Sequence, residues 1–157
     1  MVSLEFYTPE HLSAITYTLD EKQSQFTALA EEALQRIEER DDHDAFPVTI
    51  FEGGNPVGFF VLDFGQDKLE LTDNKNSVLV RSLSVNPEMQ GKGIGKTAMM
   101  KVDDFIRNHF KDCHEIVLAV NQKNESAYHI YLKAGYSYEG KTRIGRSGPQ
   151  YLMYKKL

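Results

Sequence analysis

Hydrophobic residues follow two different spacings along this chain, and the spacing changes at recognisable turn residues. A short apolar run over Leu4–Tyr7 predicts a first strand, and Thr8-Pro9-Glu10 after it is typical of a helix start. Apolar residues then recur every three or four positions, first over residues 12–19 and then over residues 26–37. This period predicts two helices, the second with apolar residues from Phe26 to Ile37 and an acidic opposite face.

The middle of the chain has the runs of apolar and β-branched residues that strands favour. Two such runs, Val48–Glu52 and Val57–Phe64, flank Gly53-Gly54-Asn55-Pro56, which is hairpin-turn chemistry. A third run over Ser77–Val85 ends at Asn86-Pro87, because proline cannot donate a hydrogen bond to a neighbouring strand.

From residue 90 onward, helical spacing alternates with short strands. Helices are expected at Ile94–Phe110 and Glu125–Ala134, and strands at Glu115–Asn121, Tyr136–Lys141 and Gln150–Lys155. Gly135, directly after the second of these helices, is a residue that commonly ends a helix.

This order of elements predicts an α/β (α+β) fold, with a mixed central sheet of about six or seven strands and helices on both faces. A strand–helix–strand unit near the centre makes the neighbouring strands parallel. No internal repeat, low-complexity tract or Pro/Gly-rich linker interrupts the chain. Residues 1–157 are therefore expected to form a single domain.

Composition narrows the classes of protein that fit. Of the 157 residues, 41% are hydrophobic and 26% are charged, as in ordinary globular domains. The net charge of −5 disfavours nucleic acid as an obligate partner, because phosphate contacts need clustered Lys and Arg. No apolar run approaches the ~20 residues that span a membrane, and the first ten residues lack the features of a secretory signal. We expect a cytoplasmic protein with no membrane partner.

Metal chemistry finds little support in the sequence. Cys113 is the single cysteine, so neither an intramolecular disulfide nor a Cys-based zinc site can form. The five histidines show neither H-x-x-x-H nor H-E-x-x-H spacing. We therefore expect no metal site.

The segment Gln90-Gly91-Lys92-Gly93-Ile94-Gly95-Lys96-Thr97 carries the most information about function. Glycines between a strand and a helix allow a tight turn and free a row of backbone N–H groups, which together with the helix dipole suit a pyrophosphate. The spacing does not fit a nucleotide-binding P-loop, because Gln90 stands where that motif needs glycine. It does not fit the dinucleotide fingerprint either, because Lys96 takes the place of the last glycine.

The same segment does fit the pattern Q-x-x-G-x-G, at Gln90, Gly93 and Gly95. The apolar strand ending in Leu83-Ser84-Val85-Asn86-Pro87 precedes it, a long amphipathic helix follows it, and residues 124–136 fit N-x-x-A-x-x-x-Y-x-x-x-G-[FY]. In this order and spacing, the three features resemble the GNAT superfamily of N-acetyltransferases, which bind acetyl-CoA. The resemblance covers residues 78–138, and residues 140–156 resemble the closing hairpin of the family.

The resemblance implies an acyl-CoA N-acyltransferase fold that uses acetyl-CoA as cosubstrate and no metal. The loop N–H groups would hold the pyrophosphate, whereas the backbone of the preceding strand and an asparagine would hold the pantetheine arm. The residues assigned to the coenzyme in this way are Leu83, Ser84, Val85, Gln90, Gly91, Lys92, Gly93, Ile94, Gly95, Lys96, Asn124 and Tyr131.

Tyr131 takes the position of the family's general acid. There it would protonate the thiolate that leaves when the amine attacks the thioester. A phenol with a pKa near ~10 can donate to a developing thiolate whose conjugate acid has a pKa near ~8.5. The same residue lies on an apolar helical stripe, where a packed aromatic side chain would also fit.

A second resemblance, to bacterial diamine and spermidine acetyltransferases, bears on the acceptor. It rests on Gln23-Ser24-Gln25-Phe26 in the second predicted helix and on Pro56-Val57-Gly58-Phe59 in the hairpin. It makes Gln25, Phe26 and Arg81 candidate substrate residues, although the resemblance implies an aspartate at the position of Arg81.

Arg81 and the general base each leave alternatives open. Arg81 beside the substrate would suit an acceptor that bears a carboxylate, or it forms an ion pair across the sheet with Asp63 or Glu70. The base that takes the proton of the ammonium substrate is Glu52, Asp63, Glu70 or a water relay.

We therefore expect an acetyl-CoA-dependent N-acetyltransferase that acetylates a primary amine of a small molecule by direct attack in a ternary complex. Acetylation of a protein N-terminus or of lysine is an alternative within the same class. From other classes, the alternatives are a P-loop-like nucleotide-binding module and a non-catalytic acyl-CoA-binding module. Tyr131 and Asn124 argue against the second of these. A homodimer would fit the habit of the family.

Overall fold

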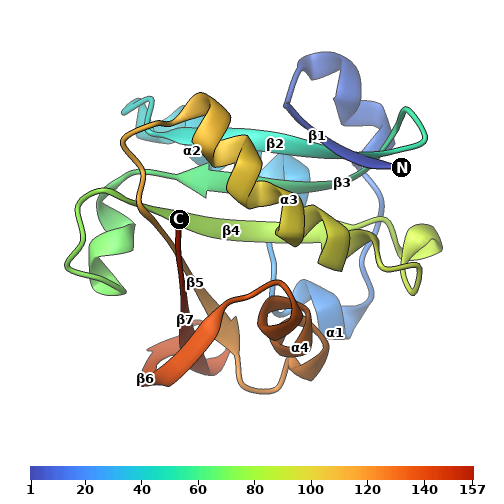
Figure 1. Cartoon of the computed structure of the whole chain (residues 1–157). Coiled ribbons are helices and arrows are strands. Elements are labelled where there is room, and N and C mark those ends of the chain that lie inside the picture. Colours follow the sequence, from blue (N-terminus) through green and yellow to red (C-terminus); the bar gives the residue numbers. More distant parts are fainter.

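The computed structural model describes residues 1–157 and is built around one seven-stranded sheet, in the order β1-β2-β3-β4-β5-β7-β6 (Figure 1). Its strands are β1 (Val2–Phe6), β2 (Ala45–Glu52), β3 (Asn55–Asp63), β4 (Ser77–Val85), β5 (Glu115–Asn121), β6 (Ser137–Gly145) and β7 (Gly148–Lys156). All neighbours are antiparallel except β4 and β5, which are parallel. The mixed sheet and its parallel pair confirm the prediction.

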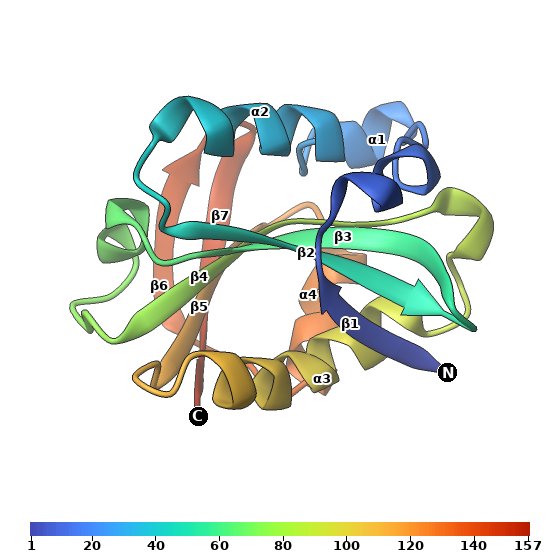
Figure 2. The same ribbon diagram turned by 90° about the horizontal axis from the view of Figure 1, so that it is seen from above.

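Helices cover both faces of the sheet. The α-helices are α1 (Glu21–Ser24), α2 (Ala30–Arg40), α3 (Ile94–His109) and α4 (Glu125–Lys133), and the 3₁₀ helices are η1 (Pro9–Ala14), η2 (Gln66–Glu70) and η3 (Pro87–Met89). Figure 2 shows α1 and α2 on one face and α3 and α4 on the other. None of these helices combines the length and the apolarity that crossing a bilayer requires.

The alternation of side chains along β3 divides the hydrophobic core between these two faces. Phe60 and Leu62 belong to the cluster that packs under α3 and α4. Phe59 and Val61, one position away, belong to the cluster under α2. Successive residues of a strand point to opposite faces, so one strand anchors both helical layers.

The segment before α2 differs from the prediction of one helix from Phe26. Asp20 accepts a hydrogen bond from the Gln23 N–H at 2.7 Å and so starts the short helix α1. The chain then leaves the helical conformation, and Leu29 is extended directly before α2. Gln25 and Phe26 therefore lie in the turn between two helices. The sequence signal for this short helix is Asp20, a residue type that often caps a helix N-terminus.

Several element boundaries also differ from prediction. The first expected helix is the 3₁₀ helix η1, and η2 was not predicted at all. β6 continues past Lys141 to Gly145, because its pairing with β7 resumes at Thr142 after a register shift. The turn Gly145-Arg146-Ser147-Gly148 joins these two strands into the expected closing hairpin.

Strands β4 and β5 separate soon after they begin. They pair only from Ser77 opposite Glu115 to Leu79 opposite Val117, so the second half of β4 has no partner strand on that side. On its other side β4 pairs with β3, with a register shift opposite Phe60 where Ser82 has a φ of 61°. This bulge turns the end of β4 away from β5, and the diverging ends open the middle of the sheet.

Candidate active site

The loop between β4 and α3 presents a row of free main-chain donors. Gly91 and Gly93 have φ values of 80° and 77°, which favour glycine, and α3 begins at Ile94. The first hydrogen bond of α3 runs from the Thr97 N–H to the Gly93 carbonyl at 3.0 Å. The N–H groups from Gly91 to Lys96 donate to no other atom of the chain. At a helix N-terminus, such a row is a site for an anionic group.

Gln90 supports this loop through its side chain. Its Nε2 donates to the Val85 carbonyl at 2.8 Å and to Gln23 Oε1 at 3.1 Å. Gln23 Nε2 donates back to Gln90 Oε1 at 2.9 Å. The glutamine of the motif therefore ties the loop to the end of β4 and to α1. Nothing in the spacing of the sequence pointed to Gln23, which lies 67 positions away.

The end of β4 lies beside this loop. Ser84 is buried, and its hydroxyl is 2.7 Å from the Tyr17 hydroxyl. Burial raises the pKa of Tyr17 to about 12, and the hydrogen bond with Ser84 opposes that rise. The side chain of Ser84 is thus occupied in holding the segment before α1. Any contact of Ser84 with a coenzyme would therefore come from its main chain.

Helix α4 contributes two of the predicted residues. Asn124 caps it, with Oδ1 accepting from the Ala127 N–H at 3.4 Å. Tyr131 lies about two helical turns further along α4 and is 8% exposed. Its ring packs edge-on against Tyr136 with centroids 5.7 Å apart. Burial raises the pKa of the Tyr131 hydroxyl, so the group stays protonated and able to donate across the physiological pH range.

Gly95 lies where the loop, β4 and α4 meet. A methyl group on its Cα would be 3.7 Å from Ile130 Cδ1 of α4 and 3.8 Å from Val85 Cγ2. The free N–H row, the diverging end of β4 and the helix that carries Tyr131 are therefore neighbours. The structure therefore places the loop and the end of β4, which the resemblance assigned to the coenzyme, beside the helix that carries Tyr131.

Arg81 takes part in an ion-pair network on the opposite face of the sheet, the one covered by α2. Asp63 is fully buried and accepts from Arg40 Nη1 at 2.7 Å, from Arg40 Nη2 at 3.0 Å and from Arg81 Nη1 at 3.1 Å. Arg81 also donates to Asp67 at 2.8 Å. Burial alone would raise the pKa of Asp63, yet hydrogen bonds from Arg40, the Gly65 N–H and Arg81 lower it. Of the two interpretations of Arg81, the structure shows the ion pair with Asp63.

The β6–β7 hairpin closes the same side of the molecule. Ser147 at its tip donates to the Gln25 carbonyl at 2.7 Å, and Arg143 Nη1 donates to Glu70 Oε2 at 2.9 Å. The predicted substrate residue Gln25 thus lies at the junction of α1 and the hairpin. Ser147 and Arg143 thus join the hairpin near the C-terminus to the turn after α1 and to η2.

The three carboxylates considered as general base are all engaged. Glu52 pairs with the N-terminal amine of Met1 at 3.0 Å, at the far edge of the sheet. Asp63 holds two arginines, and Glu70 is paired with Arg143. Glu52 is removed from the site by its position. Asp63, which is fully buried, would have to give up an arginine before it could accept a proton.

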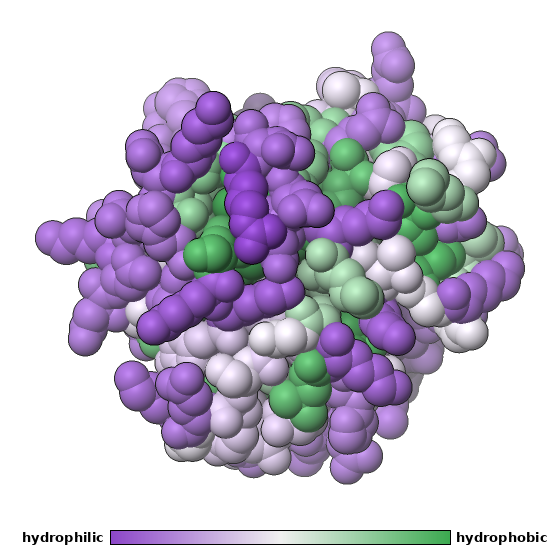
Figure 3. Space-filling view, in the orientation of Figure 1, coloured by the Kyte–Doolittle hydropathy of each residue, from purple (hydrophilic) through white to green (hydrophobic).

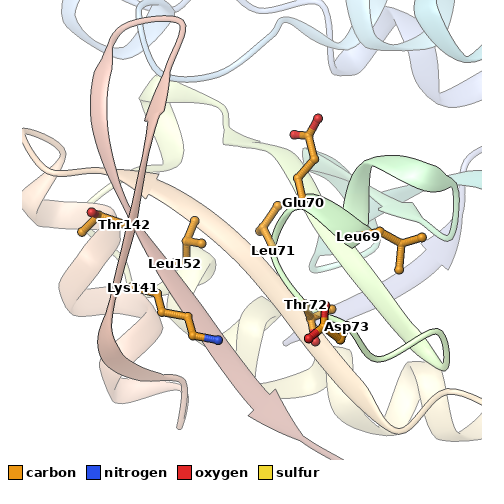
Figure 4. Close-up of a pocket in the computed structure, with 8 residues that line it drawn as sticks. All are labelled: Leu69, Glu70, Leu71, Thr72, Asp73, Lys141, Thr142 and Leu152. Atoms are coloured by element: carbon orange, nitrogen blue, oxygen red, sulfur yellow. The ribbon is translucent and has the colours of Figure 1, made fainter.

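A cavity of about 340 Å³ lies beside the Glu70–Arg143 pair, between the segment after η2 and the hairpin. Leu71 and Leu152 form its apolar part, and Lys141 extends from β6 toward Thr72 and Asp73 (Figure 4). This hollow is on the face of the sheet that carries Arg81, one of the predicted substrate residues.

Metal-ligand side chains and the single cysteine were also considered as functional groups. No group of three or more His, Cys, Asp or Glu side chains is gathered closely enough to hold a metal ion. Cys113 is buried, and burial raises the pKa of its thiol. On the face that Figure 3 shows, hydrophobic residues form only small separate patches among hydrophilic ones.

Comparisons with known proteins agree with this geometry. The model of the acetyltransferase (GNAT) family matches residues 11–136. An uncharacterised N-acetyltransferase, YbbJ of Bacillus subtilis, is 37% identical over 99% of this chain and 98% of its own length. The spermine/spermidine N(1)-acetyltransferase of the same species is 24% identical over 88% of this chain and 90% of its own.

Solved structures of similar fold include acetyltransferases of different specificity. Aminoglycoside acetyltransferase AAC(6')-Ib with coenzyme A has a TM-score of 0.78 at 19% identity, over 99% of this chain and 95% of that one. Spermidine N-acetyltransferase of Vibrio cholerae, with CoA and spermine, has a TM-score of 0.71 at 19% identity and the same coverage. Ribosomal-protein-S5-alanine acetyltransferase of Vibrio fischeri reaches 0.72 at 16% identity, over 99% of this chain and 92% of that one.

With its loop, its diverging strands and a matching family model over most of its length, the chain belongs to the acetyltransferase (GNAT) family, a family of N-acetyltransferases whose acetyl donor is acetyl-CoA.

Proposed function

We propose that this enzyme transfers the acetyl group of acetyl-CoA to a primary amine of a small molecule, by direct attack within a ternary complex. The observation that carries the proposal is the meeting of three features at Gly95. They are the free N–H row from Gly91 to Lys96, the end of β4 that has no partner on its β5 side, and the helix of Tyr131. The relatives whose names print a small amine as substrate support the choice of acceptor.

The coenzyme would lie across the diverging strands. Its pyrophosphate accepts hydrogen bonds from the main chain of Gly91–Lys96, where the dipole of α3 and the charges of Lys92 and Lys96 favour an anion. Its pantetheine amides pair with the backbone of Leu83–Val85, on the side of β4 that has no partner strand. Asn124, whose Oδ1 caps α4, has its Nδ2 left to donate to the same arm.

The chemistry then needs one proton donor and one proton acceptor. The lone pair of the amine attacks the thioester carbon, the C–S bond breaks, the thiolate takes the proton of the Tyr131 hydroxyl, and the Tyr131 phenolate regains a proton from water. Burial raises the pKa of this hydroxyl, so the group is protonated before the reaction begins. The amine loses its own proton to water, because Asp63 and Glu70 are engaged by arginines.

The test is release of the CoA thiol from acetyl-CoA across a panel of amines, with the Tyr131→Phe variant beside the native enzyme. The panel holds polyamines, aminoglycosides, amino acids, and peptides with a free N-terminus or a lysine. We expect turnover on one small-molecule class, and a kcat lower by about 100-fold or more in Tyr131→Phe, the usual contribution of a general acid.

Tyr128→Phe is the matched control, since it removes a hydroxyl from the same helix without touching the proposed acid. It should keep native kcat and melting temperature. Turnover on peptides alone would refute the small-molecule acceptor. Native kcat in Tyr131→Phe would refute its role as the acid.

A further inference from the structure

A cluster of largely buried polar groups lies behind Tyr131 and has no part in the proposed reaction. Lys155 of β7 places its Nζ 2.6 Å from Asp103 Oδ2 of α3 and 2.6 Å from the Ala134 carbonyl at the end of α4. The side chains of Lys155 and Asp103 are only 18% and 13% exposed. One ammonium group therefore joins a strand and two helices.

The end of α4 is shaped to receive this lysine. Gly135 has a φ of 97°, and a Cβ at this position would lie 3.2 Å from both Cε and Nζ of Lys155. The Lys155 Nζ is also 5.6 Å from the ring centroid of Tyr136. Tyr136 in turn packs edge-on against Tyr131. Lys155 thus contacts the helix that carries Tyr131 and the ring against which Tyr131 rests.

Stability alone gives a poor account of the cluster. Removing an ion pair from water costs about as much as the attraction returns, so apolar side chains would serve a purely structural purpose equally well. Asp103 Oδ1 and the Tyr136 hydroxyl are both buried without a hydrogen-bond partner in the chain, which adds a further cost. The cluster instead gives a defined position to one end of α4.

We infer that Lys155, held by Asp103, is a positioning residue that fixes the C-terminal end of α4 and Tyr136 so that the Tyr131 hydroxyl meets the departing thiolate. The inference rests on the proposed role of Tyr131 as the acid. Tyr131 precedes Ala134 by one helical turn, so a shift of the Ala134 carbonyl moves the phenol as well. A displacement of about 1 Å at a reacting group can cost about 100-fold in rate.

Lys155→Met keeps the length of the side chain but removes its charge and its hydrogen bonds. We expect kcat to fall about 10-fold while the KM for acetyl-CoA stays within about 2-fold, because the defect arises in the transition state. In the Tyr131→Phe background, Lys155→Met should lower kcat no further, since there is no hydroxyl left to position. Lys156→Met, on the exposed neighbour, is the control in both backgrounds.

The outcomes separate this inference from the proposed function. An equal fall in kcat in both backgrounds would overturn the positioning role while leaving Tyr131 as the acid. Native kcat in Tyr131→Phe would overturn both. If Lys155→Met folds poorly, Asp103→Asn makes the same test, since it removes the charge that holds the lysine.

Hydrogen exchange gives a readout that needs no acceptor. Amides of residues 130–136 should exchange about 10-fold faster in Lys155→Met than in native enzyme, since local opening there loses its anchor. The same amides should be unaffected in Lys156→Met. Unchanged exchange in Lys155→Met would show that the lysine does not hold this end of α4, and the inference would fall.

Discussion

The proposed coenzyme side and the proposed acceptor side of the candidate active site are built from different parts of the polypeptide. The coenzyme side is mostly main chain: free N–H groups over Gly91–Lys96 and the open backbone of β4. The acceptor side is mostly side chains from distant segments, such as Glu70 with Arg143 and Arg40 with Asp63. Main-chain donors remain when a side chain is substituted, whereas an ion pair is lost when either partner is substituted. A single substitution therefore alters the contacts of the acceptor side more readily than those of the coenzyme side.

The sharpest way to test this contrast is to remove the buried carboxylate of the acceptor side. Asp63→Ala leaves Arg40 and Arg81 without their shared partner, and we expect the free energy of unfolding to fall by about 2–3 kcal/mol, because both arginines are partly exposed and keep Asp42 and Asp67 as partners. Urea denaturation measures the change. Asp67→Ala removes only an exposed partner of Arg81 and should cost less than about 1 kcal/mol. Equal costs in the two variants would mean that burial does not distinguish these pairs.

The same carboxylate makes stability depend on pH in a definite direction. The pKa of Asp63 is lower in the folded chain than in the unfolded one, so its charged form stabilises the fold. That stability is fully present above the unfolded pKa of about 3.9 and is lost as the pH falls through the folded pKa. Asp63→Asn should lack this component. A native-like acid transition in that variant would contradict the assignment.

Gly95→Ala tests the proposed coenzyme side by adding a methyl group, whereas the variants of Asp63 remove a charge. The added methyl meets only ordinary contacts with Ile130 and Val85, so the fold should be as stable as before, or more so by up to about 1 kcal/mol. The methyl would project between Ile130 and Val85, beside the proposed path of the coenzyme, and we expect the Kd for acetyl-CoA to rise about 10-fold, the equivalent of one lost good contact. Calorimetry of CoA binding, with thermal melting of the free protein, separates the two effects.

Gln23→Ala should give the smallest effect, at the link between the two sides. It removes the exposed amide pair with Gln90, and we expect the KM for the acceptor to rise about 3-fold with the melting temperature unchanged. Gln35→Ala on α2 is the matched control, since Gln35 bonds only within its own helix. A rise of the same size in the Kd for CoA would show that the two sides are coupled through α1.

The sequence predicted the loop and the helix starts of the proposed coenzyme side, because their determinants are local. Gly93, Gly95 and Asn124 each act within a few residues of their own position, through φ angles, helix starts and a cap. The sheet order around β4, α3 and β5 followed from the same segment, since a strand–helix–strand unit dictates a parallel pair.

The acceptor side could not be predicted in this way. Gln25 meets Ser147 across 122 positions, and Glu70 meets Arg143 across 73. Such contacts depend on how the hairpin and α1 come together in three dimensions, and no spacing records them. The prediction also placed Gln25 and Phe26 on the same helix as residues 29–37. They lie instead in the turn before α2, where Gln25 meets the hairpin.

The separation of β4 from β5 has a consequence for the enzyme without its coenzyme. Beyond Leu79, β4 presents a bare strand edge in the interior of the sheet, and bare edges recruit strands from other molecules. A coenzyme whose amides pair along β4 would cap that edge like a missing strand, and light scattering with and without CoA would reveal the protection as reduced aggregation. The cosubstrate would then also act as a chaperone for the protein that consumes it.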